Sequence, residues 1–515
     1  MQMAEDWKSR ISGCLPYGKQ SKPKTRHFRS ARIRRGCERR AVRVTNPQND
    51  IRRRCWQIDS IPFILGVLVL AYTLIFSRIA YDRFRNFSDV HPEDMAAHSQ
   101  YIWNTAHGRF LQQTVLYIGG PDHLYLALAI IAPIYRVSND MFAPLFLYTL
   151  VLASGALPVY LLAKDRLGSR HWALLIGIFY LLYPGTHYLN LQGLKPNILS
   201  VSPLLFSFYF WQAKKLRWFL VSLLLASLVT EVVSFFILMY APLSWIKKRD
   251  KRWVLEPLLI AVATLTICHL IFVPLVSGGY FHGIKDHSFF HHIYLFSWRS
   301  YKHIFDFMGL AVGFLFLSWE AFVLAIPYLS FGTLTKHLQT HYYYPLAIIL
   351  WIALIYGLER IKKWRESKGL TGPPQKMMLV VALVLLGFVF CDPLLVRPKS
   401  YHRPMSRSAA DAWSLIQKIP EGASVTCDTI LLPALSLRER LHEFSRKEPQ
   451  GEKIDYLNVD YILIDPRGPH RENRHQKNYR ENAQRLMAET VRNRSGFEII
   501  ASQGDWVLFH RRNKP

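Results

Sequence analysis

The chain has little cysteine for its length, and the few cysteines form no recognisable pattern. Six cysteines occur in 515 residues. Three lie in a basic N-terminal segment, two in apolar runs and one in the polar C-terminal part: Cys14, Cys37, Cys55, Cys268, Cys391 and Cys427. These spacings match neither a zinc site nor a disulfide framework. The sequence therefore gives no support to a fold held together by disulfides or by structural zinc.

A cleavable signal peptide and an internal repeat of fixed period are also absent from the sequence. The first apolar run begins near residue 61 and is too long for the apolar region of a signal peptide. We therefore expect this run to remain in the protein as a membrane anchor. Many transporters are built from inverted repeats, so the absence of a repeat argues against a transporter.

Several long apolar segments lack charge altogether. No Asp, Glu, Lys or Arg occurs in Ile61–Phe76, in the 23 residues Met141–Ala163 or in the 20 residues Trp172–Leu191. A helix of about 20 residues crosses the ~30 Å hydrocarbon layer of a bilayer. Helices at the surface of a soluble protein carry a polar face. These segments therefore predict membrane spans.

Acidic residues are scarce relative to basic ones, and the formal net charge is +28. Residues 1–54 hold sixteen Lys and Arg against four Asp and Glu. Other basic residues cluster in short connectors between apolar runs, for example Lys164, Lys214, Lys247 and Arg360. Such connectors belong on the cytoplasmic side of a membrane. We therefore interpret the charge as orienting the protein with a cytoplasmic N-terminus, and we expect no nucleic-acid partner.

The order of apolar runs and connectors predicts a polytopic α-helical membrane protein with about 9 to 11 spans, broken half-helices included. Residues 1–58 form a basic tail that we expect to be disordered, 59–397 the transmembrane domain with an external loop at 82–122, and 398–515 an extramembrane α/β domain on the periplasmic side. Continuous spans are expected at Ile61–Tyr81, Met141–Ala163, Trp172–Leu191, Ile198–Ala213, Val254–Val276, Tyr342–Leu358 and Met377–Phe390.

Three apolar runs are predicted not to cross as single helices. The run His123–Tyr135 has only 13 residues, which favours a re-entrant or interfacial helix. In Trp218–Ile246, Glu231 stands near the middle, and a single crossing would leave the next basic cluster outside. We therefore expect two half-helices that meet at Glu231, where an ionisable residue suggests function. A second broken pair is expected around Glu320.

The polar C-terminal part shows alternating strand and helix patterns. The expected elements are helices at Ser406–Gln417, Leu435–Phe444 and Tyr479–Val491, strands at Ser424–Cys427 and Tyr461–Ile464, and two strands within 497–511. Asp428 and Asp465 each follow a strand, where sites often occur, although an aspartate in this place more often caps a turn.

The stretch most suggestive of chemistry runs from Glu93 to His123, beyond the first apolar run. Its polar residues recur at near-helical spacing and are followed by a turn: Asp94, Gln100, Trp103, Asn104 and His107, then Gly119, Gly120, Pro121, Asp122 and His123. We expect a short helix at the membrane surface, a turn and a re-entry. A solvated amphipathic helix without catalytic function would show the same pattern and stays open.

These features favour an enzyme that takes a lipid-borne substrate at the outer face. In glycosyl transfer, a carboxylate accepts the proton of the acceptor, and cations or a metal hold the departing phosphate. Asp94 is the candidate base, and Lys195, His341 and Arg299 are candidates for the phosphate. Glu231 can position one of them or a metal. No clear set of metal ligands appears, so we assign no metal residue and the cofactor stays open.

The stretch HPEDMAAHSQYIWNTAHGRF resembles the first external loop of bacterial polytopic proteins known as domain of unknown function 2079, distant relatives of the GT-C glycosyltransferases. The resemblance covers about residues 60 to 510 and rests on the order of its motifs. Further similar segments are GPDHLYLALAIIAPIYR, ASGALPVYLLAKDRLGS, LLYPGTHYLNLQGLKPN, LVTEVVSFFILMY, THYYYPL and IPEGASVTCDTILLPALSLRERLHEF.

The resemblance implies that Asp94 is the acid that GT-C enzymes use in this loop. It implies substrate-binding positions for further residues: Gln100, Trp103, Asp122, His123, Lys195, Glu231, His341 and Tyr342. The chain also departs from the family pattern, because Ser99 stands where a second acid is expected. Lys195 and Asn197 replace the histidine and the glutamate of the outer turn. These losses put a metal site in doubt, and Lys195 can supply a fixed positive charge instead.

The resulting hypothesis is a glycosyltransferase-like protein of a bacterial inner membrane. The resemblance implies a donor in which a sugar is linked to polyprenyl phosphate, used on the periplasmic face with Asp94 as base. Two alternatives stay open. A transporter or lipid-binding protein also uses broken helices and intramembrane acids, and a membrane protein without catalysis would need none of these roles.

Overall fold

The computed structural model describes residues 60–89, 91–116, 120–277, 312–334, 344–369, 404–445, 457–469 and 478–512. The chain divides into two units after Ile58, and all described residues belong to the second. The expected span Met377–Phe390, Arg299 and the pair His341 and Tyr342 lie outside the described residues.

Among the described residues, four helices are long and apolar enough to cross a membrane. They are α2 (Ser60–Arg85), α6 (Phe142–Ser154) continued by α7 (Ala156–Leu167), α14 (Lys251–Ile267) continued through the π-helical turn η3 (Cys268–Phe272) by α15 (Val273–Val276), and α20 (Tyr344–Ser367). The polytopic α-helical fold expected from the uncharged runs is thus confirmed.

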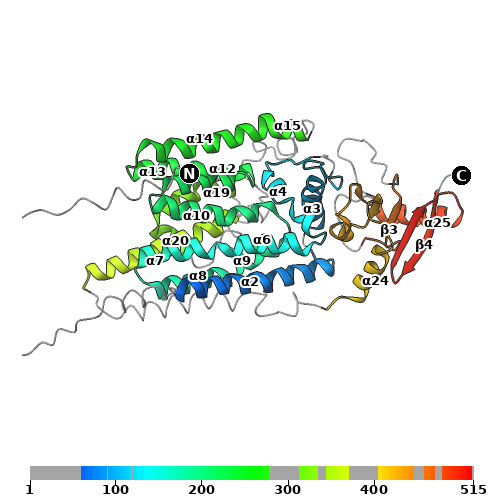
Figure 1. Ribbon diagram of the computed structural model, residues 1–515, viewed down its shortest axis with the longest axis horizontal. Coiled ribbons are helices and arrows are strands. Elements are labelled where there is room, and N and C mark those ends of the chain that lie inside the picture. Colours follow the sequence, from blue (N-terminus) through cyan, green and yellow to red (C-terminus); the bar gives the residue numbers. More distant parts are fainter. Residues whose placement is uncertain are drawn as a thin grey trace, which may run out of the picture. The chain divides into compact units, whose positions relative to one another are not determined.

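Shorter elements fill the space between the long helices (Figure 1). In chain order they are α3 (Pro92–Ala106), α4 (Leu126–Ile131), α5 (Ile134–Val137), α8 (Arg170–Leu182), α9 (Pro184–Asn190), η1 (Pro196–Ser200), α10 (Val201–Gln212), α11 (Leu216–Ser227), η2 (Glu231–Val233), α12 (Ser234–Leu238), α13 (Tyr240–Ile246), α18 (Val312–Leu317) and α19 (Trp319–Leu334).

The helix break expected at Glu231 is present. The chain leaves α11, passes through extended Thr230 (φ −167°, ψ 145°) and restarts at Glu231 in the 3-10 turn η2. The Thr230 hydroxyl accepts a hydrogen bond from the Val232 amide and so caps the new turn. The second expected break lies at Ser318, whose hydroxyl accepts from the Ala321 amide at the start of α19.

One expected span is interrupted. Residues 172–191 were predicted to form a single crossing, but the helix ends at Leu182 and α9 begins at Pro184. Proline disfavours helical geometry in the residue before it and offers no N–H. Tyr183 is accordingly extended (φ −72°, ψ 128°). The expectation was wrong because an uncharged run does not require an unbroken helix.

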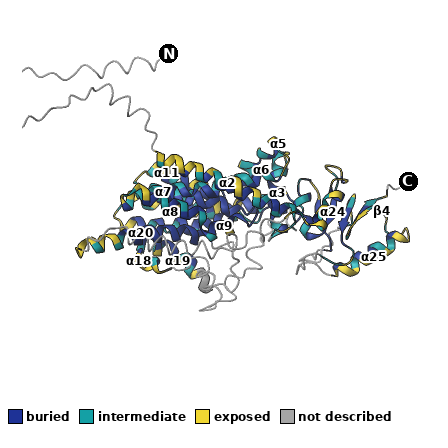
Figure 2. Cartoon of the chain, turned by 90° about the horizontal axis from the view of Figure 1, so that it is seen from below, coloured by how far each residue is buried: buried dark blue, intermediate teal, exposed yellow. Residues whose placement is uncertain are grey.

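Burial separates the central helix from the peripheral ones. In the apolar stretch that makes α20 a candidate span, 89% of the residues are buried inside the protein. The corresponding share is 28% in α2 and 28% in the continuous helix α14–α15. The exposed positions of α2 are apolar, for example Phe63 at 64% and Leu74 at 52%. Figure 2 shows exposed positions along the outer helix α11 as well. An exposed apolar face on several helices is what a bilayer requires.

The close packing of α7 and α8 depends on Gly155. The Tyr180 hydroxyl donates a hydrogen bond of 2.7 Å to the Leu152 carbonyl oxygen and occupies the space beside Gly155. A Cβ atom at this glycine would overlap the hydroxyl of the buried Tyr180. We expect Gly155→Ala to lower the free energy of unfolding by about 1–3 kcal/mol, because overpacking displaces the tyrosine.

Thermal unfolding of the purified protein measures this effect. Gly66→Ala is the matched control, since it also lies in a long helix but has no atom within 4 Å of the added Cβ. Alanine is the better helix former, so Gly66→Ala should leave stability unchanged or slightly raised. Equal melting temperatures of the two variants would contradict the role given to Gly155.

The C-terminal residues form a five-stranded sheet in the order β2-β1-β3-β5-β4. The strands are β1 (Val425–Cys427), β2 (Leu441–Glu443), β3 (Tyr461–Ile464), β4 (Phe497–Gln503) and β5 (Trp506–Arg511), with helices α24 (Arg407–Ile416) and α25 (Tyr479–Val491) and the 3-10 turns η6 (Thr429–Leu431) and η7 (Pro433–Leu435). Strands β1, β2 and β3 are parallel, while β5 pairs antiparallel with β3 and β4.

The helix expected at residues 435–444 is wrong. This segment ends the turn η7 and then forms the edge strand β2, in which Leu441 and Glu443 are buried and His442 between them is partly exposed. The Thr114 hydroxyl accepts from the Leu441 amide at 2.8 Å and donates to its carbonyl oxygen at 2.9 Å. Pairing with β1 and with the external loop outweighs local helix propensity here.

Candidate active site

Helix α3 brings Asp94 to its first turn. The helix begins at Pro92, whose fixed φ angle suits the first helical position. Glu93 and Asp94 follow in the first turn, where the unsatisfied N–H groups of a helix favour negative charge. The sequence thus makes the segment around Asp94 both helical and acidic, as expected.

Lys195 reaches Asp94 from a part of the chain 101 residues away. It stands before Pro196, which holds its backbone extended (φ −76°, ψ 116°) at the entrance to η1. The Lys195 Nζ donates a hydrogen bond to Asp94 Oδ2. The lysine side chain is 7% exposed and that of the aspartate 35%. The structure therefore joins two residues predicted from separate motifs, and their catalytic roles stay predictions.

The charges of this pair set the protonation of Asp94. Burial alone would raise the pKa of the Asp94 carboxyl, but the Lys195 ammonium outweighs it and leaves the pKa below its ordinary value. Asp94 is thus ionised at neutral pH, with part of its surface still accessible. An ionised, partly open carboxylate beside a buried cation suits proton acceptance close to an anionic group.

His98 belongs to the same cluster and was missed in the sequence. It lies one helical turn after Asp94, and such a spacing places two side chains on one helix face. Burial lowers the pKa of His98 to about 3, so the imidazole is neutral. Its ring meets Tyr125 edge-on at 5.4 Å, and its buried Nδ1 has no hydrogen-bond partner within the described part of the chain. The i, i+4 spacing was the available signal.

A second charged pair joins the turn 120–123, the segment predicted to re-enter the membrane, to the helix break at Glu231. His123 Nδ1 lies 2.6 Å from Glu231 Oε1, and the Leu124 amide donates to Glu231 Oε2 at 3.0 Å. Burial alone would lower the pKa of His123, but Glu231 and Asp122 outweigh it and raise the pKa to about 10. Asp122 Oδ2 is 3.8 Å from His123 Nε2. The predicted residues Asp122, His123 and Glu231 thus form one contact group.

Two side-chain hydroxyls, one from α3 and one from the end of α15, fix the backbone of the turn before His123. The Tyr101 hydroxyl of α3 donates to the Gly120 carbonyl oxygen at 3.1 Å. The Ser277 hydroxyl, just after α15, donates to the Pro121 carbonyl oxygen at 2.5 Å. The turn therefore connects the helix that carries Asp94 to the long helix α14–α15.

Gln100 contacts the C-terminal sheet domain. It is fully buried, its Nε2 donates to the Arg438 carbonyl oxygen at 2.8 Å and its Oε1 accepts from the Thr114 amide at 2.8 Å. Helix α3 packs against the turns η6 and η7 of this domain. The predicted substrate contact of Gln100 is not tested by these bonds, but they give it a structural role in coupling the domains.

Trp103 lies further along α3, in its last turn. Its indole N–H donates to Asn139 Oδ1 at 3.3 Å, and its ring lies 4.1 Å from that of His107. The guanidinium of Arg109 lies over the same indole at 5.3 Å. The substrate contact predicted for Trp103 stays a prediction.

The residues around Asp94 do not fit a carboxylate-rich site for magnesium or manganese. Hard divalent ions of this kind prefer several oxygen ligands. Asp94 is already paired with the Lys195 ammonium, and Ser99 shares a hydrogen bond of 2.9 Å with Tyr135 in place of a second acid. A fixed ammonium therefore occupies the place that an ion would take beside Asp94.

The aspartates that follow strands cap turns. Asp428 Oδ1 accepts from the Ile430 amide at 3.1 Å, and Asp465 Oδ1 accepts from the Arg467 amide at 2.9 Å.

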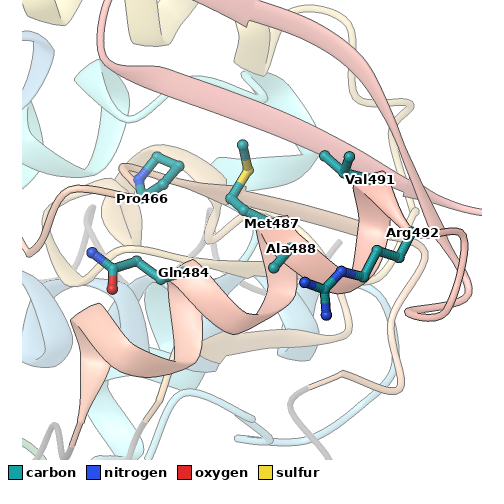
Figure 3. A pocket seen from close by; sticks show the side chains of 6 residues that line it. All are labelled: Pro466, Gln484, Met487, Ala488, Val491 and Arg492. Carbon is teal, nitrogen blue, oxygen red and sulfur yellow. The ribbon is translucent and has the colours of Figure 1, made fainter.

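A depression also exists on the C-terminal domain (Figure 3), lined by Pro466, Gln484, Met487, Ala488, Val491 and Arg492. None of these residues belongs to the elements that carry Asp94, Lys195 or Glu231, so we place no chemistry there.

Comparison with known proteins agrees with this architecture. The model of the family described as predicted membrane protein (DUF2079) matches residues 94–508. No protein among the curated sequences matches the chain.

Among solved structures, ArnT from Cupriavidus metallidurans in the apo state is similar to the chain with a TM-score of 0.54 at 14% identity. The match covers 86% of this chain and 97% of ArnT. ArnT bound to undecaprenyl phosphate gives a TM-score of 0.56 at 12% identity, with the same coverage. At this identity the likeness shows the fold alone, which is that of ArnT.

Proposed function

Given that the chain belongs to the DUF2079 family of predicted membrane proteins, we propose that it is a membrane glycosyltransferase that takes its sugar from a polyprenyl-phosphate donor. The observation that carries the proposal is the ion pair between Asp94 and the buried Lys195. It provides a proton acceptor and a fixed cation side by side, on the fold that ArnT uses. ArnT has been solved with undecaprenyl phosphate, a ligand of the proposed class.

The reaction follows from the two charges. Asp94 accepts the proton of an acceptor hydroxyl, whose oxygen attacks the anomeric carbon of the sugar. The bond between that carbon and the phosphate oxygen breaks, and its electron pair leaves with polyprenyl phosphate. Lys195 has three N–H donors, so it can bind the phosphate while it remains bonded to Asp94. Attack opposite the leaving group inverts the anomeric carbon.

The neighbouring groups fit supporting roles in this proposal. His98 is neutral, and its free Nδ1 can receive a hydrogen bond from a hydroxyl of the sugar or of the acceptor. The His123 imidazolium adds a second positive charge for the phosphate. His341 and Tyr342 keep the substrate-binding role that the resemblance implies. We place the site on the periplasmic face of a bacterial inner membrane, with the basic N-terminal tail in the cytoplasm.

The decisive experiment uses the full-length protein in lipid vesicles with radiolabelled polyprenyl-phosphate sugars. Vesicles with the protein should release free polyprenyl phosphate faster than vesicles without it. Movement of the intact donor between leaflets without release of sugar would favour a transporter instead. Neither release nor movement across a panel of donors would favour a membrane protein without catalysis.

A further inference from the structure

A cluster of three chemically different donor groups lies beside the re-entrant turn. One donor atom each of Glu231, Cys268 and His269 lie within 4.8 Å of one another. Glu231 and Cys268 are buried, at 5% and 0% exposure. None of these contacts involves the Asp94–Lys195 pair, but Glu231 also binds His123, to which the proposed transfer reaction gives a role.

A local irregularity of the helix presents the two neighbouring donors. In a regular α-helix, successive residues point about 100° apart around the axis. Cys268 and His269 open the π-helical turn η3, where the long helix α14–α15 is locally widened. Such π-turns are rare and often occur at functional sites. The widened turn allows both side chains to approach Glu231, which a continuous α-helix would hinder.

The donor set selects the class of metal. A thiolate, an imidazole and a single carboxylate together suit zinc, whereas magnesium and calcium prefer oxygen ligands alone. Zinc bonds of about 2.0–2.3 Å in tetrahedral geometry hold donor atoms roughly 3.3–3.8 Å apart. Closing from 4.8 Å requires small rotations of the Cys268 and His269 side chains. Three protein ligands would leave a fourth position open.

Glu231 is already oriented as a ligand carboxylate should be. His123 Nδ1 is 2.6 Å from one oxygen, and the Leu124 amide donates to the other at 3.0 Å. Hydrogen bonds of this kind fix the direction of a ligating carboxylate and tune its affinity. Each carboxylate oxygen has a second lone pair free for the metal.

We propose that Glu231, Cys268 and His269 form a zinc site next to the re-entrant turn, with His123 and Leu124 orienting the carboxylate. Tyr101 of the helix that carries Asp94 and Ser277 after α15 both donate hydrogen bonds to this turn. An ion bound beside the turn would therefore stabilise the position of that helix relative to α14–α15.

The test measures metal directly rather than activity. In the full-length parent protein, Cys14, Cys37, Cys55 and Cys391 are replaced by serine, so that Cys268 and Cys427 are the remaining cysteines. After loading with zinc and removal of free metal, mass spectrometry should find about one zinc ion per chain. Cys268→Ser should bind zinc at least about tenfold more weakly. Cys427→Ser is the matched control, because Cys427 is also buried but lies in β1, and it should retain the metal.

A second readout covers the case in which Cys268→Ser fails to fold. In the Cys427→Ser form of the parent, Cys268 is the sole cysteine, so a thiolate-to-metal absorption band after loading with cobalt identifies it as a ligand. Three results would overturn the proposal: no zinc bound to the parent, the same zinc affinity in folded Cys268→Ser, or a cobalt complex without a thiolate band.

Discussion

Replacing Asp94 by asparagine should lower the release of polyprenyl phosphate by about 10²–10⁴-fold, which is the usual contribution of a positioned general base. Asparagine keeps the shape of the side chain but cannot accept the proton. The rate is measured with labelled donor in vesicles, as for the native protein. Asp94→Glu, which keeps the carboxylate and moves it by one methylene, should recover part of the lost activity.

The matched control is Glu93→Gln, which neutralises the neighbouring carboxylate in the same first turn of α3. Its rate should stay within about twofold of the native rate, because Asp94 is the carboxylate that accepts the hydrogen bond of Lys195. Equal losses in the two variants would point to the charge of the helix terminus rather than to a base. Full activity of Asp94→Asn would refute the assignment outright.

Folding must be separated from catalysis in this variant. Asp94→Asn leaves the buried Lys195 without its carboxylate, which can cost about 3 kcal/mol of stability. Adding Lys195→Met removes the unpaired charge and should recover most of that loss, as measured by thermal unfolding. The double variant should fold but remain inactive, since both proposed groups are gone.

The second large expected effect is a loss of stability when the ion pairs around Glu320 are removed. This carboxylate is 2% exposed and lies 3.0 Å from Lys247 Nζ and 2.6 Å from Arg360 Nη2, so it joins α19 to the end of α13 and to α20. Replacing Lys247 and Arg360 together by methionine should lower the free energy of unfolding by about 3–5 kcal/mol, because a buried charge is left without a partner. Adding Glu320→Gln should restore most of this stability. Unfolding by heat or denaturant in detergent measures both steps.

An exposed pair supplies the control for this experiment. Arg252 and Glu256 are 3.1 Å apart on α14, with side-chain exposures of 77% and 29%. Arg252→Met should cost less than about 1 kcal/mol, as is usual for surface ion pairs. If the variant lacking Lys247 and Arg360 melts like Arg252→Met, Glu320 does not hold the helices together.

The errors in sequence interpretation have local physical causes. The segment 172–191 carries no charge, which predicts a span, yet Pro184 interrupts the helix because it lacks an N–H group. The segment 435–444 has helix-like spacing of apolar residues, but Leu441 pairs with Val425 of β1 instead. Patterns of polarity report which residues avoid water, whereas the choice between helix and strand here depends on a partner strand.

The candidate site was found in part. Asp94, Lys195 and Glu231 stand out in the sequence because a charge near an apolar run is unusual. His98 was missed because a histidine in a polar loop carries no such contrast. The substrate contact of Gln100 stays a prediction. Its amide also bridges Thr114 and Arg438, and no local pattern could indicate a contact with a residue 338 positions later in the chain.

The sequence by itself determined that this is a membrane protein, that its helices break near Glu231 and Glu320, and that an acidic helix begins close to Asp94. These properties depend on runs of adjacent residues, because the length of an apolar run, its charge and its prolines act on the local backbone. The tertiary structure alone decided that Lys195 neutralises Asp94, that His123 binds Glu231 and that the turns η6 and η7 contact α3. Ion pairs between distant residues depend on the folded path of the chain, which brings charges together in a low-dielectric interior where each strongly affects the other.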